Sequence, residues 1–192
     1  MDDFRERLDA ITEATMRGRT ITGKLLAFSR KHDPDPQPTD VNLLLDRVLE
    51  VKDLDFKTSN IEVVRDYEED MPGVMVNRNQ MDQVILNLLN NAKDAIDRTG
   101  RITLRTRKED EWVRIDVQDT GVGMTREVLE KIFMPFFTTK RVGKGTGLGL
   151  SISYGIVDSL RGYIGVKSTP GSGSTFSIFI PVLGEAQRGT NG

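Results

Sequence analysis

Three polar side chains share one face of a helix predicted over residues 79–98, NQMDQVILNLLNNAKDAIDR. Asn87, Asn91 and Asp94 stand at i, i+4 and i+7, so they project side by side. A carboxamide offers an acceptor oxygen without a charge, which suits a Mg²⁺ ion that keeps most of its waters and binds mainly to substrate phosphates. Asparagines that are merely solvated on a surface helix explain this segment equally well when it is considered alone.

A second candidate group, DTGVG at residues 119–123, follows a predicted strand. The Asp119 carboxylate offers an acceptor to an exocyclic amine, and Gly121 and Gly123 let the backbone approach a flat ligand. An ordinary Asp-Gly turn is the commoner origin of such a pattern. This cluster therefore indicates a binding site only in combination with others.

A third group, GTGLGL at residues 145–150, is a glycine-rich turn that runs directly into a predicted helix. The amide groups and the dipole at a helix N-terminus bind anions, and Lys140, Arg141 and Lys144 precede the turn, so phosphate is the expected ligand. A P-loop does not fit, because its lysine and hydroxyl are missing from the required positions. A dinucleotide-binding unit does not fit either, because no strand precedes the turn.

The segment IFMPFFTTK at residues 132–140 carries three phenylalanines, Phe133, Phe136 and Phe137, just before this turn. Residues 134–147 have little periodicity and many glycines, so we interpret them as a mobile loop. Such a loop would act as a lid that orders a reactive phosphate and excludes water. Simple hydrophobic anchoring of the loop is the alternative.

The composition excludes several classes of site. The 192 residues carry a net charge of -2 with both signs interspersed, which gives no electrostatic case for nucleic acid. The absence of cysteine excludes disulfides and zinc-thiolate sites, and the single histidine, His32, excludes multi-histidine metal sites. No apolar run is long enough to cross a bilayer. We therefore expect a cytoplasmic segment that makes no membrane contact.

The elements that must position these residues are predicted from hydrophobic periodicity. A helix with a narrow apolar stripe is predicted over residues 4–30, and it requires a partner, most simply a second helix and a second copy of the chain. A proline-rich linker follows over 32–39. Asp40 is expected to cap a helix over 40–53, and Asn79 to cap the central helix. The other predictions are strands over 61–67, 71–76, 101–107, 112–118, 162–169 and 173–182, with helices over 124–134 and 146–161. Strands interrupted by helices favour an α+β two-layer sandwich with a mixed sheet over a doubly wound parallel fold.

Five segments in this order resemble the N, G1, F, G2 and G3 boxes of the catalytic domain of bacterial sensor histidine kinases, members of the GHKL ATPase superfamily: NLLNNAKDAI, DTGVGM, IFMPFFTTK, GTGLGLS and GSGSTF. The resemblance implies a Bergerat ATP-binding fold, with about five strands packed on three helices, over residues 40–183. ITGKLLAFSRK is similar to the end of the second helix of the dimerisation and phosphotransfer domain, which assigns residues 1–31 to part of that domain. Residues 184–192 are expected to form a flexible tail.

Position by position, the resemblance implies that Asn91 ligates Mg²⁺ and that Asn87 assists at the metal or at water. Asp119 would accept from the adenine amino group, with Gly123 beneath the base and Thr175 acting through water. The residues expected to contact ATP or ADP are Asn87, Asn91, Asp94, Asp119, Gly121, Gly123, Ile132, Lys140, Lys144, Gly145, Thr146, Gly147, Leu148, Gly149 and Thr175.

Within this set, Gly145, Gly147 and Gly149 would cradle the phosphates through their amides, and Lys140 and Lys144 would pair with the phosphate charge. The three phenylalanines, Phe133, Phe136 and Phe137, would anchor the lid and help it dock on the phosphotransfer helices.

Two departures from the family pattern stand out. Many relatives place a basic residue three positions after the metal-binding asparagine, where this chain has Asp94, and Lys93 beside it is a doubtful substitute. The phosphoacceptor histidine is missing, because His32 lies in a proline-broken linker and cannot sit on a helix face. We therefore expect a piece of a longer protein that binds nucleotide but does not phosphorylate itself.

The resemblance also implies two partners, which are a phosphotransfer helix in cis or in trans and a response regulator receiver domain. It implies that the full-length protein is a homodimer, and it leaves open whether that protein is anchored in a membrane. Two alternatives stay open. One is a GHKL ATPase that uses ATP-driven dimer closure, although such enzymes carry a glutamate base where this chain has Asn87. The other is a non-catalytic module in which nucleotide only regulates docking.

Overall fold

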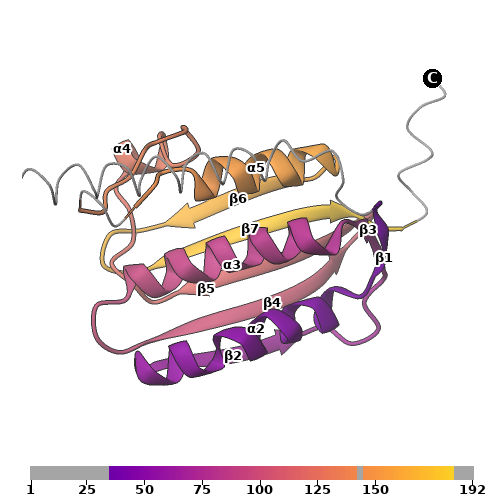
Figure 1. Ribbon diagram of the computed structural model, residues 1–192, viewed down its shortest axis with the longest axis horizontal. Coiled ribbons are helices and arrows are strands. Elements are labelled where there is room, and N and C mark those ends of the chain that lie inside the picture. The colour runs from indigo at the N-terminus through magenta and orange to yellow at the C-terminus, as the bar shows by residue number, and fades with distance from the viewer. Residues whose placement is uncertain (1–34, 142–144, 184–192) are drawn as a thin grey trace, which may run out of the picture.

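The computed structural model describes residues 35–141 and 145–183, which form a mixed five-stranded sheet covered on one face by three long helices (Figure 1). The strand order is β2 (Ile61–Tyr67), β4 (Gly100–Glu109), β5 (Trp112–Asp119), β7 (Ser174–Pro181) and β6 (Tyr163–Ser168). The β2 and β4 strands are parallel and every other neighbouring pair is antiparallel. The predicted α+β two-layer fold is therefore confirmed.

Three long helices, α2 (Val41–Thr58), α3 (Arg78–Ala95) and α5 (Gly149–Ser159), form the second layer, and a short helix, α4 (Arg126–Leu129), lies beyond the end of β5. The α3 helix packs between α2 and α5 and against β5. Because α3 also provides the crossover between the parallel strands β2 and β4, it occupies the middle of the fold. No helix among the described residues is long and apolar enough to cross a membrane.

A second, two-stranded sheet closes one end of the molecule. Its strands β1 (Gln37–Thr39) and β3 (Val74–Val76) are antiparallel, and Val74 bridges to Val182 after the last strand of the main sheet. The proline-rich linker predicted over 32–39 thus ends as a strand of the folded domain. A proline is tolerated there because Pro38 lies in a short edge strand.

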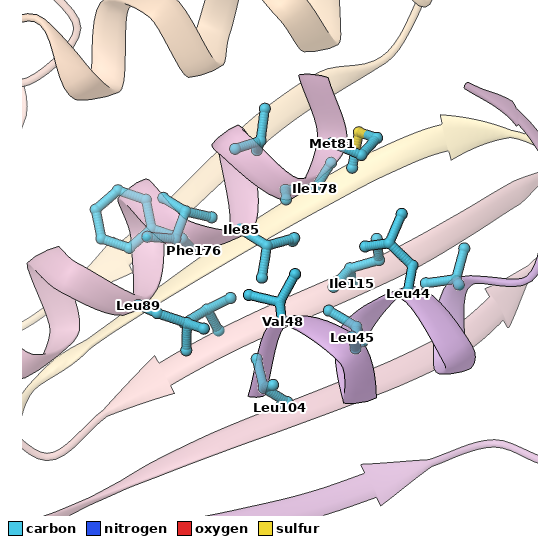
Figure 2. Packing of buried hydrophobic residues seen from close by; sticks show 14 of the residues in the cluster. Leu44, Leu45, Val48, Met81, Ile85, Leu89, Leu104, Ile115, Phe176 and Ile178 are labelled. Carbon is cyan, nitrogen blue, oxygen red and sulfur yellow. The ribbon is translucent and has the colours of Figure 1, made fainter. Parts of the chain in front are cut away.

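The core lies between the sheet and the helices, and most of its side chains are aliphatic (Figure 2). Leu45 of α2, Ile85 and Leu89 of α3, and Ile115 and Ile178 of the sheet are fully buried. Each such side chain stabilises the fold by about 1.5–3 kcal/mol relative to an exposed one. The apolar residues of α3 are buried over a wide part of its circumference, because α3 contacts both neighbouring helices as well as the sheet.

Three predicted boundaries of α2 and α3 were wrong. Asn77, rather than Asn79, caps α3, because its side-chain oxygen accepts from the amide of Gln80 at 3.2 Å. This helix ends at Ala95, since Ile96 is already extended. Asp40 caps α2 as predicted, but α2 continues past residue 53 to Thr58 because Phe56 extends its buried face.

The other predicted elements form close to their expected places. The strand predicted over 71–76 and the helix predicted over 124–134 differ most in length. The strand shortens to β3, and the helix shortens to the single turn of α4. The helix expected over 146–161 starts later, at Gly149, and ends at Ser159. The described parts of the predicted loop, 134–141 and 145–147, contain no regular element. The predicted N-terminal helix, His32, Lys144 and the tail after residue 183 lie outside the described residues.

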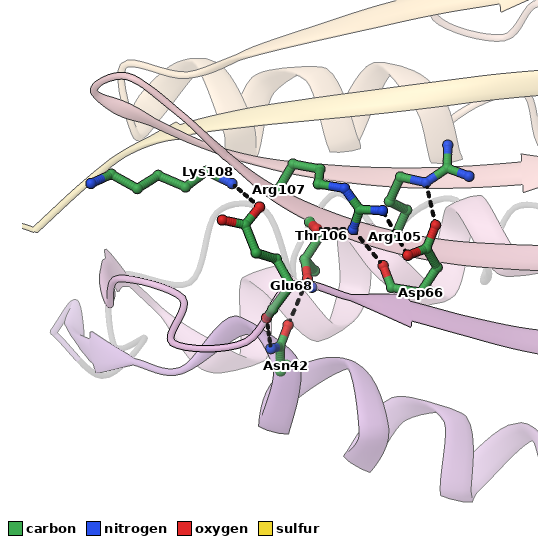
Figure 3. A network of polar contacts seen from close by, with 7 residues as sticks. All are labelled: Asn42, Asp66, Glu68, Arg105, Thr106, Arg107 and Lys108. Atoms are coloured by element: carbon green, nitrogen blue, oxygen red, sulfur yellow. Dashed lines mark hydrogen bonds and ion pairs between the residues drawn. The ribbon is translucent and has the colours of Figure 1, made fainter.

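A buried hydroxyl ties α2 to the sheet at the end of β2 (Figure 3). Thr106, which is fully buried, donates to Asn42 Oδ1 at 2.8 Å and accepts from the Glu68 amide at 3.1 Å. Asn42 in turn donates to the Glu68 carbonyl at 3.0 Å. Beside this network Asp66 pairs with Arg105 and Arg107, both at 2.6 Å. The polar groups thereby hold α2 in register with β2 and β4.

We expect Thr106→Val to lower the free energy of unfolding by about 1–3 kcal/mol, because it removes the buried hydroxyl that donates to the Asn42 carboxamide oxygen and accepts from the Glu68 amide. The measurement is urea denaturation followed by circular dichroism. Thr103→Val is the matched control, since Thr103 lies on the same strand with its side chain on the uncovered face, and should change stability by less than about 0.5 kcal/mol. Equal effects of the two variants would contradict a role for the network.

Candidate functional site

A cavity of about 820 Å³ opens between the C-terminal half of α3, the end of β5, α4 and the glycine-rich turn before α5. This volume is in the range of sites for small ligands and cofactors. The structure brings eleven of the predicted site residues to its walls, from four separate segments of the chain. They are Asn87, Asn91, Asp94, Asp119, Gly123, Ile132, Lys140, Gly145, Thr146, Gly147 and Gly149.

The two asparagines of α3 have different partners in this cavity. Asn87 donates from its amide nitrogen to the Gly149 carbonyl at 3.1 Å and to Ser153 Oγ at 3.2 Å, so it ties α3 to the start of α5. Asn91 Oδ1 accepts from Lys140 Nζ at 3.1 Å. The oxygen of Asn91 therefore already contacts a cation, while the amide of Asn87 fixes the distance between two walls of the cavity.

Asp119, at the end of β5, is 3% exposed yet borders the cavity. Its Oδ1 accepts from the Gly121 amide at 2.8 Å, which fixes the orientation of the carboxyl group. Burial raises the pKa of Asp119, and the hydrogen bonds from the backbone amides of Gly121 and Ser174 oppose that rise. Such a buried acceptor is placed to select a ligand that carries a hydrogen-bond donor.

The two glycines after Asp119 are required by packing against other parts of the backbone, and not only by access of a ligand. A Cβ at Gly121 would lie 2.4 Å from the Ala95 carbonyl oxygen, and one at Gly123 would lie 2.0 Å from that of Thr169. Gly123 also has a φ of +66°, which favours glycine. The sequence-based interpretation, that these glycines admit a flat ligand, thus missed their role in joining β5 to α3 and to the turn before β7.

The glycine-rich turn packs against the phenylalanine-rich segment. Gly147 has a φ of +66°, accepts from the Phe136 amide at 2.9 Å, and would place a Cβ 2.3 Å from the Phe136 carbonyl carbon. A Cβ at Gly145 would lie 2.4 Å from Thr138 Oγ1. The turn and the segment before it therefore act as one unit that forms a wall of the cavity.

Three predicted site residues are not on the cavity walls, and a fourth, Lys144, is outside the described residues. Gly121 and Leu148 lie behind the wall, and Leu148 is buried. Thr175 borders a smaller cavity of about 190 Å³ together with its cross-strand neighbours Gln118 and Lys167. Because side chains alternate along a strand, Ser174 and not Thr175 borders the large cavity.

Several other residues of the cavity walls were missed by sequence reasoning. Asn90 lies on α3 between the two predicted asparagines. Ser174 and Phe176 are alternate residues of β7 that share its buried face, so they can be found only once it is known which face of that strand is buried. Met124 and Leu150 also border the cavity, and they stand within the DTGVGM and GTGLGLS segments. Asp55 and Val128 border it too, but they lie outside the five segments.

The three predicted lid phenylalanines lie in different surroundings. Phe133 contacts Tyr154 of α5, with ring centroids 5.4 Å apart. Phe137 borders the cavity and packs against the core. Phe136 is 61% exposed. Two of the three therefore anchor the segment to the domain and the third presents its ring to solvent.

Two lysines on the cavity walls are paired with carboxylates. Lys93 contacts Asp55 of α2, and Lys52 contacts the same carboxylate, so the two lysines lower the pKa of Asp55. Lys140 pairs with Asp94 at 2.6 Å and also contacts Asn91. Lys93 is therefore directed to α2, whereas Lys140 lies over the polar face of α3.

The donor set fits a Mg²⁺ ion that is held mostly by phosphates and water. Among the described residues no group of three or more His, Cys, Asp or Glu side chains could hold a metal. The Asn91 oxygen, which faces a cation, is the kind of single neutral ligand that such an ion takes from a protein. A metal without a phosphate ligand would bind this cavity weakly.

A family model described as histidine kinase-, DNA gyrase B-, and HSP90-like ATPase matches residues 76–184. The chain is 41% identical over 194 residues to sensor kinase CckA of Brucella abortus (strain 2308), a match that includes 93% of this chain but only 20% of that protein. The chain thus spans about a fifth of the length of this relative.

Solved structures are similar as well. The catalytic domain of histidine kinase ThkA, in a nucleotide-free form, superposes with a TM-score of 0.71 at 31% identity, over 78% of this chain and 97% of that one. ThkA in complex with the response regulator protein TrrA gives a TM-score of 0.73 at 28% identity, over 90% of this chain and 49% of that one. Full-length ShkA in complex with AMPPNP gives a TM-score of 0.71 at 27% identity, over 80% of this chain and 32% of that one.

Asp119 should make the domain less stable at neutral than at acidic pH. A carboxyl group whose pKa is raised by folding binds its proton more tightly in the native than in the unfolded chain, so its contribution to stability falls as the pH rises above the unfolded value. Asp119→Asn keeps the acceptor for the Gly121 amide but cannot ionise. We expect the stability of this variant relative to the wild type to increase as the pH rises above about 4, the ordinary pKa of an aspartate.

Urea denaturation of both proteins across this pH range measures the difference. Asp110→Asn is the control, because Asp110 occupies the β4–β5 turn with a φ of +52°, a conformation that asparagine also adopts. A relative stability of Asp119→Asn that does not change with pH would contradict the raised pKa.

Proposed function

The chain belongs to the family of histidine kinase-, DNA gyrase B- and HSP90-like ATPases, and on that premise we propose that its cavity binds Mg²⁺-ATP and presents the γ-phosphate to a histidine. The histidine belongs to a phosphotransfer helix, and the phosphoryl group then passes to an aspartate of a response regulator. The domain is thus the nucleotide-binding catalytic part of a sensor histidine kinase. The sensor kinase CckA and the histidine kinase ThkA, which this chain resembles, support this choice within the family.

A single observation carries the proposal: an amide oxygen on α3, a buried carboxylate at the end of β5 and the glycine-rich turn before α5 border one cavity. The Asp119 carboxylate accepts from the adenine amino group, and Ile132, Met124 and Phe176 give the base an apolar environment. The amides of residues 145–149 bind the phosphates. The distance between these groups is set by the Asn87 bridge to Gly149.

Asn91 is proposed as the protein ligand of Mg²⁺. The metal would neutralise phosphate charge and orient the γ-phosphate for in-line attack. The chain's own part is to hold the nucleotide and to keep water away from it, and the aromatic and aliphatic walls formed by Phe137, Val128 and Ile132 serve the second purpose.

Transfer to a histidine is favoured over hydrolysis by the side chain at position 87. Hydrolytic members of the superfamily use a glutamate there as a general base, whereas Asn87 donates both amide hydrogens to Gly149 and Ser153. An amide that is fixed in this way cannot activate water. A neutral imidazole needs no strong base, so an external histidine is a suitable nucleophile.

The partners follow from this assignment. We propose that residues 1–31 contribute to the dimerisation and phosphotransfer domain, that the linker over 32–39 joins it to the catalytic domain, and that the full-length protein is a homodimer. ThkA has been crystallised with a response regulator, which supports a receiver domain as the final acceptor. The exposed ring of Phe136 and the neighbouring Met134 are proposed to contact the phosphotransfer helices.

We expect Asp119→Asn to weaken the binding of AMPPNP about tenfold or more, because the amide nitrogen would face the adenine amino group, donor against donor. The same nitrogen can donate to the O6 atom of guanine, so the preference for adenine over guanine nucleotides should fall. Isothermal titration with AMPPNP and with the guanine analogue measures both changes. The Asp110→Asn variant should bind like the wild type, and an unchanged preference in Asp119→Asn would remove Asp119 from the base site.

The transfer reaction itself is tested with γ-labelled ATP and Mg²⁺. The label should move to a separate histidine-bearing helical hairpin from a sensor kinase relative, should not appear on this chain alone, and should fail to move with Asn91→Ala. Label on the isolated chain would identify His32 as the acceptor. Rapid release of phosphate without transfer would favour the ATPase with dimer closure, and binding that is equal with and without Mg²⁺, again without transfer, would favour a regulatory module.

A further inference from the structure

An ion pair joins α3 to the segment before the glycine-rich turn, between residues 46 positions apart in the sequence. Asp94 Oδ2 lies 2.6 Å from Lys140 Nζ, and the same nitrogen lies 3.1 Å from Asn91 Oδ1. All three side chains border the large cavity. One ammonium group is therefore shared between a carboxylate and the oxygen proposed to ligate the metal.

The other lysine of α3 cannot supply a charge at this place. Lys93 is directed toward Asp55, which also binds Lys52. Asp94, which follows Lys93 in the sequence, borders the cavity. Without Lys140, this carboxylate would make the polar face of α3 negatively charged at the cavity. The main-chain position of Lys140 is supported locally, since its amide donates to Thr138 Oγ1 at 3.2 Å and its side-chain carbons pack on Gly145.

We propose that Asp94 is a positioning residue that holds the Lys140 ammonium beside Asn91, where it binds the nucleotide phosphates. This inference rests on the proposed function, because it assumes that phosphates occupy this cavity. In this role Asp94 acts through Lys140, and not by the direct contact with the nucleotide that the resemblance implies. It fixes the lysine on the face of α3 that carries Asn91, and by doing so it also joins the lysine's segment to the helix.

Simple electrostatics gives the opposite expectation for Asp94. A carboxylate beside a phosphate site repels the ligand, and its removal should strengthen the binding of an anionic nucleotide. If Asp94 positions Lys140, its removal should instead weaken binding, because a flexible lysine must then be ordered by the ligand alone. The side chains of Asp94 and Lys140 are 48% and 34% exposed, so either one can be replaced without disturbing the core. The sign of the change therefore distinguishes the two roles.

The shared contact with Asn91 adds a second expectation. Lys140 and a metal ion cannot both bind the same carboxamide oxygen closely, since two cations would then repel each other. When Mg²⁺ takes Asn91, Lys140 must give up that oxygen but can keep Asp94. The contribution of Lys140 to nucleotide binding should accordingly be greater in the absence of Mg²⁺.

The test is isothermal titration of AMPPNP into the 192-residue chain, with Mg²⁺ and with EDTA. Asp94→Asn should weaken binding about fivefold. Lys140→Met should weaken it by a similar factor, more strongly in EDTA than in Mg²⁺, and the double variant should be no weaker than Lys140→Met alone. Asp94→Glu, which keeps the charge, should recover part of the loss.

Asp97→Asn is the matched control. Asp97 borders the same cavity but lies beyond the C-terminal end of α3, and among the described residues it forms no ion pair, so its neutralisation should leave binding unchanged or strengthen it. The inference is overturned if Asp94→Asn binds AMPPNP as well as or better than the wild type, or if the losses of the two single variants add. A wild-type chain that does not bind AMPPNP would instead overturn the proposed function, and the inference with it.

Discussion

The site depends on the burial of α3 on three sides. Its aliphatic side chains pack on the sheet and on the two neighbouring helices, which leaves one strip of the helix free to border a cavity. Asn87, Asn91 and Asp94 lie on that strip. Because the core fixes the rotation of α3 about its axis, the polar strip is aimed at the end of β5 and at the glycine-rich turn without any contribution from a ligand.

Backbone packing completes this arrangement. Gly121 and Gly147 allow the loop after β5 and the turn before α5 to approach other backbone segments to distances that a Cβ would prevent. The Asn87 bridge then sets the spacing between α3 and α5. A cavity built from such contacts is preorganised, so less of the binding free energy is lost in ordering the protein when a ligand binds.

Two lysines that border the cavity, Lys93 and Lys140, are paired with carboxylates of other elements. Asp55 of α2 holds Lys93 of α3, and Asp94 of α3 holds Lys140 of the segment before α5. Each pair is partly exposed, so its contribution to the stability of the fold is small. These pairs matter because they position the lysines. Asp55 directs Lys93 away from the polar strip, and Asp94 holds Lys140 on it.

The sequence by itself determined the fold class, the order of the main elements and eleven of the residues that border the cavity, because hydrophobic periodicity, capping residues and glycine-rich turns are local signals. Even so, it misplaced the cap of α3, where Asn77 and Asn79 offer the same chemistry two positions apart. Only the tertiary structure decided that Ser174 rather than Thr175 borders the cavity, which depends on the register of β7. It also decided the partners of Lys93 and Lys140, since an ion pair between residues 46 positions apart leaves no periodic trace in the sequence. Such contacts arise from the packing of whole elements, and that packing is a property of the folded chain.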